Sequence, residues 1–96
     1  MIFILDTQMY PKIFYIERLL YVKNSSDIKA FGTHLRKIRE GNELSQQQLA
    51  DMADVAKITV QRIENAKFTV TLDVMVSIAK ALNMPLKDLV NFKIGK

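Results

Sequence analysis

Residues 44–65 constrain the fold of this chain most, because their sequence, LSQQQLADMADVAKITVQRIEN, has the pattern of two short helices joined by a tight turn. Ser45 and Gln48 have the spacing of a capping box, in which each side chain accepts a hydrogen bond from the backbone N–H of the other residue. Asp54 falls between the two patterns, and aspartate is among the few residues that tolerate a left-handed turn conformation. We therefore predict one helix that begins at Ser45 and a second helix over residues 56–65.

The second predicted helix has an unusual outer face. Val60 and Ile63 point to one side, whereas the residues on the other side comprise two cations, two amides, one isoleucine and no acid. Such groups can bond base edges and phosphates in the major groove of DNA, and an isoleucine can contact a thymine methyl. The alternative is a solvated helix surface with an accidental basic bias. The outward residues are Lys57, Ile58, Gln61, Arg62 and Asn65.

This stretch resembles the helix-turn-helix of the Cro/cI-type repressors, also called the XRE family. The resemblance lies in LSQQQLAD, the turn and ITVQRIEN, and it extends back to FGTHLRKIRE (31–40) and forward to TLDVMVSIAKALNMPLKDL (71–89). It implies an all-α, five-helix, lambda-repressor-like DNA-binding domain over residues 27–96. Residues 1–26 would then be an extra N-terminal apolar segment of unknown structure.

The resemblance also implies a function. The protein would be a sequence-specific, double-stranded DNA-binding transcriptional regulator, a repressor that acts as a homodimer in the cytoplasm. The residues expected to read bases are Lys57, Ile58, Gln61 and Arg62. Those expected to position phosphates are Ser45, Gln46, Asn65 and Lys67.

Two charged residues are expected to join helices. In the resembled repressors, the residues that match Arg39 and Glu64 form a salt bridge. A bidentate arginine–carboxylate pair fixes the direction of two helix axes as well as their distance. The alternative is that Arg39 and Glu64 are two unrelated surface charges.

The chain departs from the family pattern at four positions around the second helix. Ala56 stands where Ser or Thr often caps that helix, and the loss of such a cap costs about 1 kcal/mol. Asp54 and Ala66 replace common glycines, and Val70 replaces a common proline. None of these changes removes a group from the predicted DNA-facing side, but Ala66 predicts either a strained backbone or a different turn.

Three further helices are predicted around the central pair. The first runs from the linker 24–26 to about Glu40, with Gly41 and Asn42 as a left-handed end. The second is capped by Thr71, and the last begins near Pro85. The inward residues are expected to include Phe31, Leu35, Ile38, Leu72, Met75, Val76, Ala79, Leu82, Leu86, Leu89 and Val90, whereas Lys29, Arg36 and Lys37 are expected to face away.

The N-terminal segment is apolar on all sides, so its pattern distinguishes neither helix from strand. It is not a membrane span, because charged residues interrupt every apolar window of sufficient length, and it lacks the features of a secretory signal. It could pack across a dimer partner, cover a patch on its own domain, or be an extension with little role. We favour packing between two copies, because an exposed apolar segment favours aggregation and the tail adds Phe92 and Ile94.

Composition argues against an enzyme. The chain has one histidine, no cysteine and three scattered glycines, which leave no nucleophile–base pair and no phosphate-binding loop. His34 lacks the partners that a metal site would need, so we expect neither a metal nor another cofactor. The absence of cysteine agrees with a reducing cytosol, and the net charge of +4 suits a nucleic-acid partner.

Two other functions fit the same pattern. An antitoxin with this fold would bind both its own promoter and a toxin protein. A protein-interaction module would keep the helix-turn-helix without touching DNA, and its binding would not depend on DNA sequence.

Overall fold

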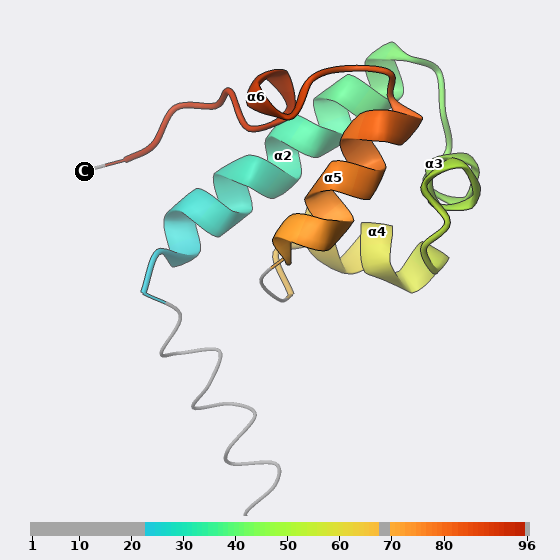
Figure 1. Cartoon of the computed structure of the whole chain (residues 1–96). Coiled ribbons are helices and arrows are strands. Elements are labelled where there is room, and N and C mark those ends of the chain that lie inside the picture. Colours follow the sequence, from blue (N-terminus) through green and yellow to red (C-terminus); the bar gives the residue numbers. More distant parts are fainter. Residues whose placement is uncertain (1–22, 68–69, 96) are drawn as a thin grey trace, which may run out of the picture.

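A computed structural model describes residues 23–67 and 70–95, and in these two ranges it contains five helices and no strand (Figure 1). This confirms the expected all-α fold with five helices. The predictions for residues 1–22 concern a segment outside the described residues. The helices are α2 (Ser25–Gly41), α3 (Gln46–Ala53), α4 (Lys57–Glu64), α5 (Leu72–Ala81) and α6 (Leu86–Leu89).

The helices surround one small core. The long helix α2 crosses α4, α3 packs against both α4 and α5, and α6 packs against α5 (Figure 1). Four of these helices are ten residues or shorter, and helices of that length depend on tertiary packing for their stability. The buried apolar side chains are Phe31, Leu35, Leu49, Ala50, Ala53, Val60, Ile63, Ile78, Ala79 and Leu89.

The predicted side-chain caps of α3 and α5 are present, whereas Asn24, at the start of α2, makes no side-chain cap hydrogen bond. The Ser45 hydroxyl accepts a hydrogen bond from the Gln48 backbone N–H at 3.0 Å, and the Gln48 side chain accepts one from the Ser45 N–H at 2.8 Å. Thr71 caps α5 in the same way through the Val74 N–H. Asp54 adopts the left-handed conformation, with φ 57°, between α3 and α4. Local sequence therefore specifies the start of α3 and the turn before α4, whereas Ala56 provides no side-chain cap for α4.

A glycine sets the distance between α2 and α4. A Cβ atom added to Gly32 would lie 2.4 Å from the backbone oxygen of Ile63 and 3.0 Å from that of Glu64. Real Cβ atoms do not approach carbonyl oxygens so closely, so only glycine permits this crossing. The position of α4 relative to the rest of the fold thus depends on Gly32.

Four sequence-based expectations, about Leu72, Val90, the end of α2 and Phe92, are wrong. Leu72 and Val90 were expected to face inward, but they are 61% and 38% exposed. The left-handed residue after α2 is Glu43 rather than Gly41 or Asn42. Phe92 packs on Phe31, with ring centroids 5.7 Å apart, so it adds little surplus apolar surface. The tail lies against α2 at two points, through the contact of Phe92 with Phe31 and a hydrogen bond from the Gly95 N–H to Asp27 Oδ1 at 2.8 Å.

Ala66 adopts the left-handed conformation, with φ 56°, where a non-glycine residue costs about 1–2 kcal/mol. Ala66→Gly should therefore raise the free energy of unfolding by about 0.5–1 kcal/mol, because relief of strain outweighs the greater freedom of glycine in the unfolded chain. Urea unfolding followed by circular dichroism measures the change. Ala81→Gly, within α5, is the control and should destabilise. A loss of stability in Ala66→Gly would show that this turn is not strained.

Candidate nucleic-acid interface

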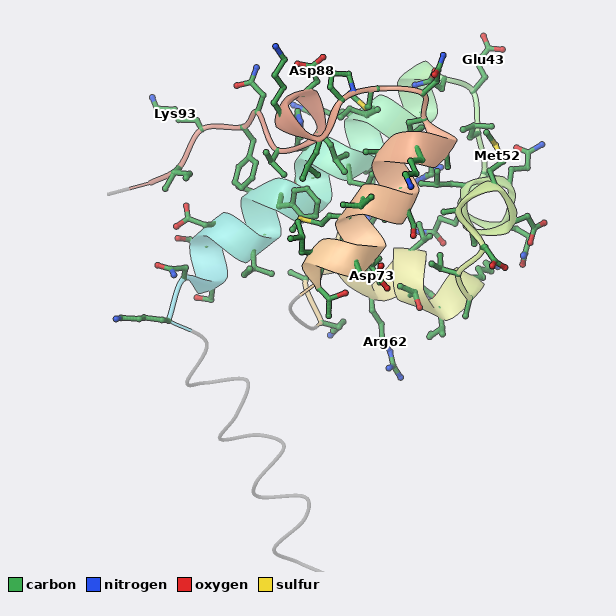
Figure 2. The ribbon with its side chains drawn as sticks, in the orientation of Figure 1. Glu43, Met52, Arg62, Asp73, Asp88 and Lys93 are labelled. Carbon is green, nitrogen blue, oxygen red and sulfur yellow. The ribbon has the colours of Figure 1, made fainter. Side chains whose placement is uncertain are left out.

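The outward face of α4 contains every residue expected to read bases. Lys57, Ile58, Gln61 and Arg62 are all exposed, and Ile58 is 47% exposed despite its apolar side chain. Figure 2 shows Arg62 extending from α4 away from the body of the fold. The opposite side of the helix is buried through Val60, Ile63 and Glu64. The outward face of the helix therefore presents two cations, one amide and one aliphatic side chain.

The four residues expected to position phosphates lie at the two ends of the helix-turn-helix. Ser45 precedes α3, and Gln46 is its first residue. Asn65 follows α4, and Lys67 is held just beyond by a hydrogen bond from its backbone N–H to the Arg62 carbonyl at 2.8 Å. Ser45, Asn65 and Lys67 are exposed, whereas Gln46 is half-buried.

Arg39 and Glu64 form a bidentate ion pair between α2 and the end of α4. Arg39 Nε donates to Glu64 Oε2 at 2.6 Å, and Arg39 Nη2 donates to Glu64 Oε1 at 2.9 Å. The Glu64 side chain is fully buried, and that of Arg39 is 10% exposed. Arg39 Nη1 also donates to the Leu44 carbonyl at 2.7 Å, so this one guanidinium fixes α4 and the start of α3 at once.

Two further side chains donate to the same carboxylate. Gln46 Nε2 donates to Glu64 Oε1 at 3.0 Å, and Arg36 Nε donates to the same oxygen at 3.4 Å. Arg36 was expected to face away from the fold, and the structure corrects that expectation. Helical spacing could have predicted this contact, because Arg36 lies three residues before Arg39 and therefore on a similar side of the helix. No local sequence pattern predicts the contact between Gln46 and Glu64, which are 18 residues apart.

Burial and hydrogen bonding act in opposite directions on Glu64. Burial of the carboxylate raises its pKa, but hydrogen bonds from Arg39, Gln46 and Arg36 lower the pKa by more, so it lies below its ordinary value. The hydrogen bond to Glu64 raises the pKa of Arg39. Both groups are therefore charged at neutral pH, and the pair acts as a fixed structural element.

A second basic surface lies on α2. An open groove of about 520 Å³ between α2 and the tail is lined by Lys29, Lys37 and Lys93, together with apolar and hydroxyl side chains. His34 also lines it, with its ring centroid 6.0 Å from that of Phe92 in a tilted arrangement, and its Nε2 lies 3.4 Å from the Asp88 carbonyl oxygen. This places His34 at the boundary between α2 and the tail.

The described residues include no helix that is long and apolar enough to cross a membrane.

Comparison with known proteins identifies the family. The helix-turn-helix family HTH_3 matches residues 35–89. The solved structure of the restriction-modification controller protein C.AhdI from Aeromonas hydrophila is 30% identical, with a TM-score of 0.65, and the match covers 67% of this chain and 97% of that one. A search of curated proteins gives no match.

Two other solved structures share the fold at lower identity. An HTH_3 family transcriptional regulator from Vibrio cholerae is 19% identical, with a TM-score of 0.66 over 70% of this chain and 38% of that one. The clp gene regulator ClgR from C. glutamicum is 22% identical, with a TM-score of 0.62 over 67% of this chain and 83% of that one. The matched segment contains both helices of the helix-turn-helix and the Arg39–Glu64 pair, and the chain belongs to the HTH_3 helix-turn-helix family, the XRE family of DNA-binding regulators.

Proposed function

We propose that this protein is a transcriptional regulator that binds double-stranded DNA in a sequence-specific way and acts as a homodimeric repressor. Its family and fold are those of DNA-binding regulators rather than of enzymes. One observation carries the proposal. The outward face of α4 bears Lys57, Gln61 and Arg62, all exposed, and no acid.

The chemistry of this face suits the major groove. An arginine fork matches guanine O6 and N7, a glutamine matches adenine N6 and N7, and an isoleucine can contact a thymine methyl. In a helix-turn-helix, the second helix lies in the major groove and its N-terminal residues contact base edges. In the proposed complex, Lys57, Ile58, Gln61 and Arg62 read bases, while Ser45, Gln46, Asn65 and Lys67 hold the backbone on either side.

A homodimer is proposed for a geometric reason. The outward face of an eight-residue helix reads only a few base pairs, and two copies on adjacent half-sites supply the specificity that one lacks. The half-sites would then lie about 34 Å apart, one helical turn, in a near-palindrome. The exposed apolar side chains in the tail region, Val90 and Ile94, are candidates for the surface between the two copies.

The variants Arg62→Ala and Lys67→Ala should have different kinds of effect on DNA binding. Arg62→Ala should weaken specific binding by about 1–3 kcal/mol and relax the preference at one base pair per half-site. Lys67→Ala should weaken binding to all sequences alike. It should also lower the salt slope, the slope of the logarithm of the binding constant against the logarithm of the salt concentration, by about one per subunit. Selection on a random duplex library, followed by affinity measurements at two salt concentrations, separates the two effects.

Lys87→Ala is the matched control, because it removes one charge from α6, across the fold from α4 (Figure 1). It should change neither base preference nor salt slope. If Arg62→Ala kept the full base preference and changed only the salt slope, the assignment of the reading face would be wrong. If the parent protein preferred no sequence over random duplex, the regulator proposal would fail in favour of an interaction module.

A further inference from the structure

Arg36 links the buried ion pair to the exposed end of α4. Its Nε donates to Glu64 Oε1 at 3.4 Å, and its Nη2 donates to Asn65 Oδ1 at 3.1 Å. Arg36 is on α2, whereas Asn65 caps the C-terminus of α4. One guanidinium therefore bridges a residue inside the fold and a residue on the proposed DNA-facing surface.

The contact fixes the orientation of the Asn65 amide. A guanidinium carries only donors, so the atom of Asn65 that faces Arg36 must be the carbonyl oxygen. The NH₂ group of the same amide is then turned away from Arg36. A phosphate oxygen is an acceptor, so this orientation is the one in which Asn65 can donate to DNA.

Charge balance gives Arg36 a second role. The bidentate contact with Arg39 already neutralises the single negative charge of Glu64. The three residues Arg36, Arg39 and Glu64 together carry a formal charge of +1, and the exposed Glu40 contacts Arg39 at 3.8 Å rather than Arg36. The Arg36 side chain is 43% exposed, while that of Glu64 is fully buried. A surplus positive charge beside an outward-turned amide donor is a suitable arrangement for an anion.

We propose that Arg36 is a positioning residue that turns the Asn65 amide toward a DNA backbone phosphate and adds its own positive charge at that phosphate. The ligand is a phosphate rather than a base edge because Asn65 follows the last turn of α4, whereas the N-terminal part of a recognition helix reads bases. This inference rests on the proposed function, and it assigns a residue from α2 to the DNA surface. The Arg36–Glu64 contact is long and the Arg36 side chain is partly exposed, so we expect Arg36 to contribute less to stability than to DNA binding.

Arg36→Met tests the charge. Purified protein is titrated with its selected duplex and with a random duplex at several salt concentrations. The variant should bind both duplexes about three- to tenfold more weakly and should lose about one from the salt slope per subunit. Lys37→Met is the matched control, because Lys37 is the next residue along α2 and is exposed. It removes the same charge without touching Asn65, and its salt slope should equal that of the parent.

A double-mutant cycle tests the positioning. Asn65→Ala should weaken binding in the parent but have much less effect in the Arg36→Met background, because the amide is no longer oriented there. Arg36→Lys should recover the salt slope but not the coupling, since an ammonium cannot donate to Glu64 and Asn65 in the same fixed fork. The melting temperature of each variant should stay within about 5 °C of the parent, because Arg39 keeps its bidentate contact with Glu64.

The outcomes separate this inference from the proposed function. If the parent shows salt-dependent, sequence-specific binding and Arg36→Met leaves both slope and affinity unchanged, Arg36 does not act on DNA. Additive effects of Arg36→Met and Asn65→Ala overturn the positioning role. If the parent itself shows no binding to duplex DNA, the proposed function fails and this inference fails with it.

Discussion

Replacing Glu64 with alanine is expected to lower the free energy of unfolding by about 3–5 kcal/mol, because it leaves the buried Arg39 without its counter-charge. Arg39 is 10% exposed at its side chain, so water can solvate it only in part. Gln46 and Arg36 lose an acceptor in the same step. In a domain of this size, a loss of that order should lower the melting temperature by more than about 10 °C.

A double-mutant cycle attributes the loss to the pair itself. The combination of Arg39→Met with Glu64→Leu should recover more than half of the lost stability, since matched apolar residues can replace a buried ion pair at little cost. Glu40→Ala is the control, because Glu40 is exposed and lies 3.8 Å from Arg39, and it should cost less than about 1 kcal/mol. Small, additive effects at Arg39 and Glu64 would show that the pair does not hold the helices.

The lowered pKa of Glu64 adds a pH signature to the same prediction. The folded state binds fewer protons at this carboxyl than the unfolded chain does, because the folded pKa lies below the unfolded one. Its stabilising contribution is therefore complete above the unfolded value of about 4.3 and is lost as pH falls through the folded pKa. Urea unfolding of parent and Glu64→Gln should differ most near pH 7 and converge in acid. A constant difference at every pH would contradict this linkage.

Gly32→Ala is expected to be the other strongly destabilising change, at about 3 kcal/mol, the upper end of the range for overpacking. The added methyl would meet the backbone oxygens of Ile63 and Glu64, at 2.4 and 3.0 Å. Backbone atoms in a helix cannot rotate aside as a flexible side chain can, so α2 and α4 must separate. The shift would move α4 relative to α3, and DNA affinity should fall even in the fraction that remains folded.

Gly41→Ala is the matched control for this prediction. Gly41 is the last residue of α2, and no atom lies within 4 Å of an added Cβ. Alanine is favoured over glycine in a helix by about 0.5–1 kcal/mol, so this variant should be as stable as the parent or more so. Thermal unfolding and the affinity for duplex DNA of both variants give the comparison. Equal losses at Gly32 and Gly41 would show that the close approach to α4 is not the cause of the loss at Gly32, because no atom lies near an added Cβ at Gly41.

Local sequence determined the starts of α3 and α5, the turn between α3 and α4, and the outward face of α4. Ser45 and Gln48 encode the first helix of the motif because a capping box needs only residues three apart. The left-handed turn at Asp54 is equally local. The exposed face of α4 follows from the periodicity of a helix with one buried side. Each of these features depends only on residues within one or two helical turns of one another, so the sequence predicts it without knowledge of the packing.

Tertiary structure alone decided how the charged residues share one carboxylate. The donors to Glu64 come from Arg36, Arg39 and Gln46, at sequence separations of 28, 25 and 18 residues. Family resemblance pointed to Arg39, but only the crossing of α2 over α4 at Gly32 brings Arg36 to Asn65. Helical periodicity gives the direction of a side chain around its own axis. It does not give the neighbour that the direction meets, because that depends on the crossing angle and spacing of two helices.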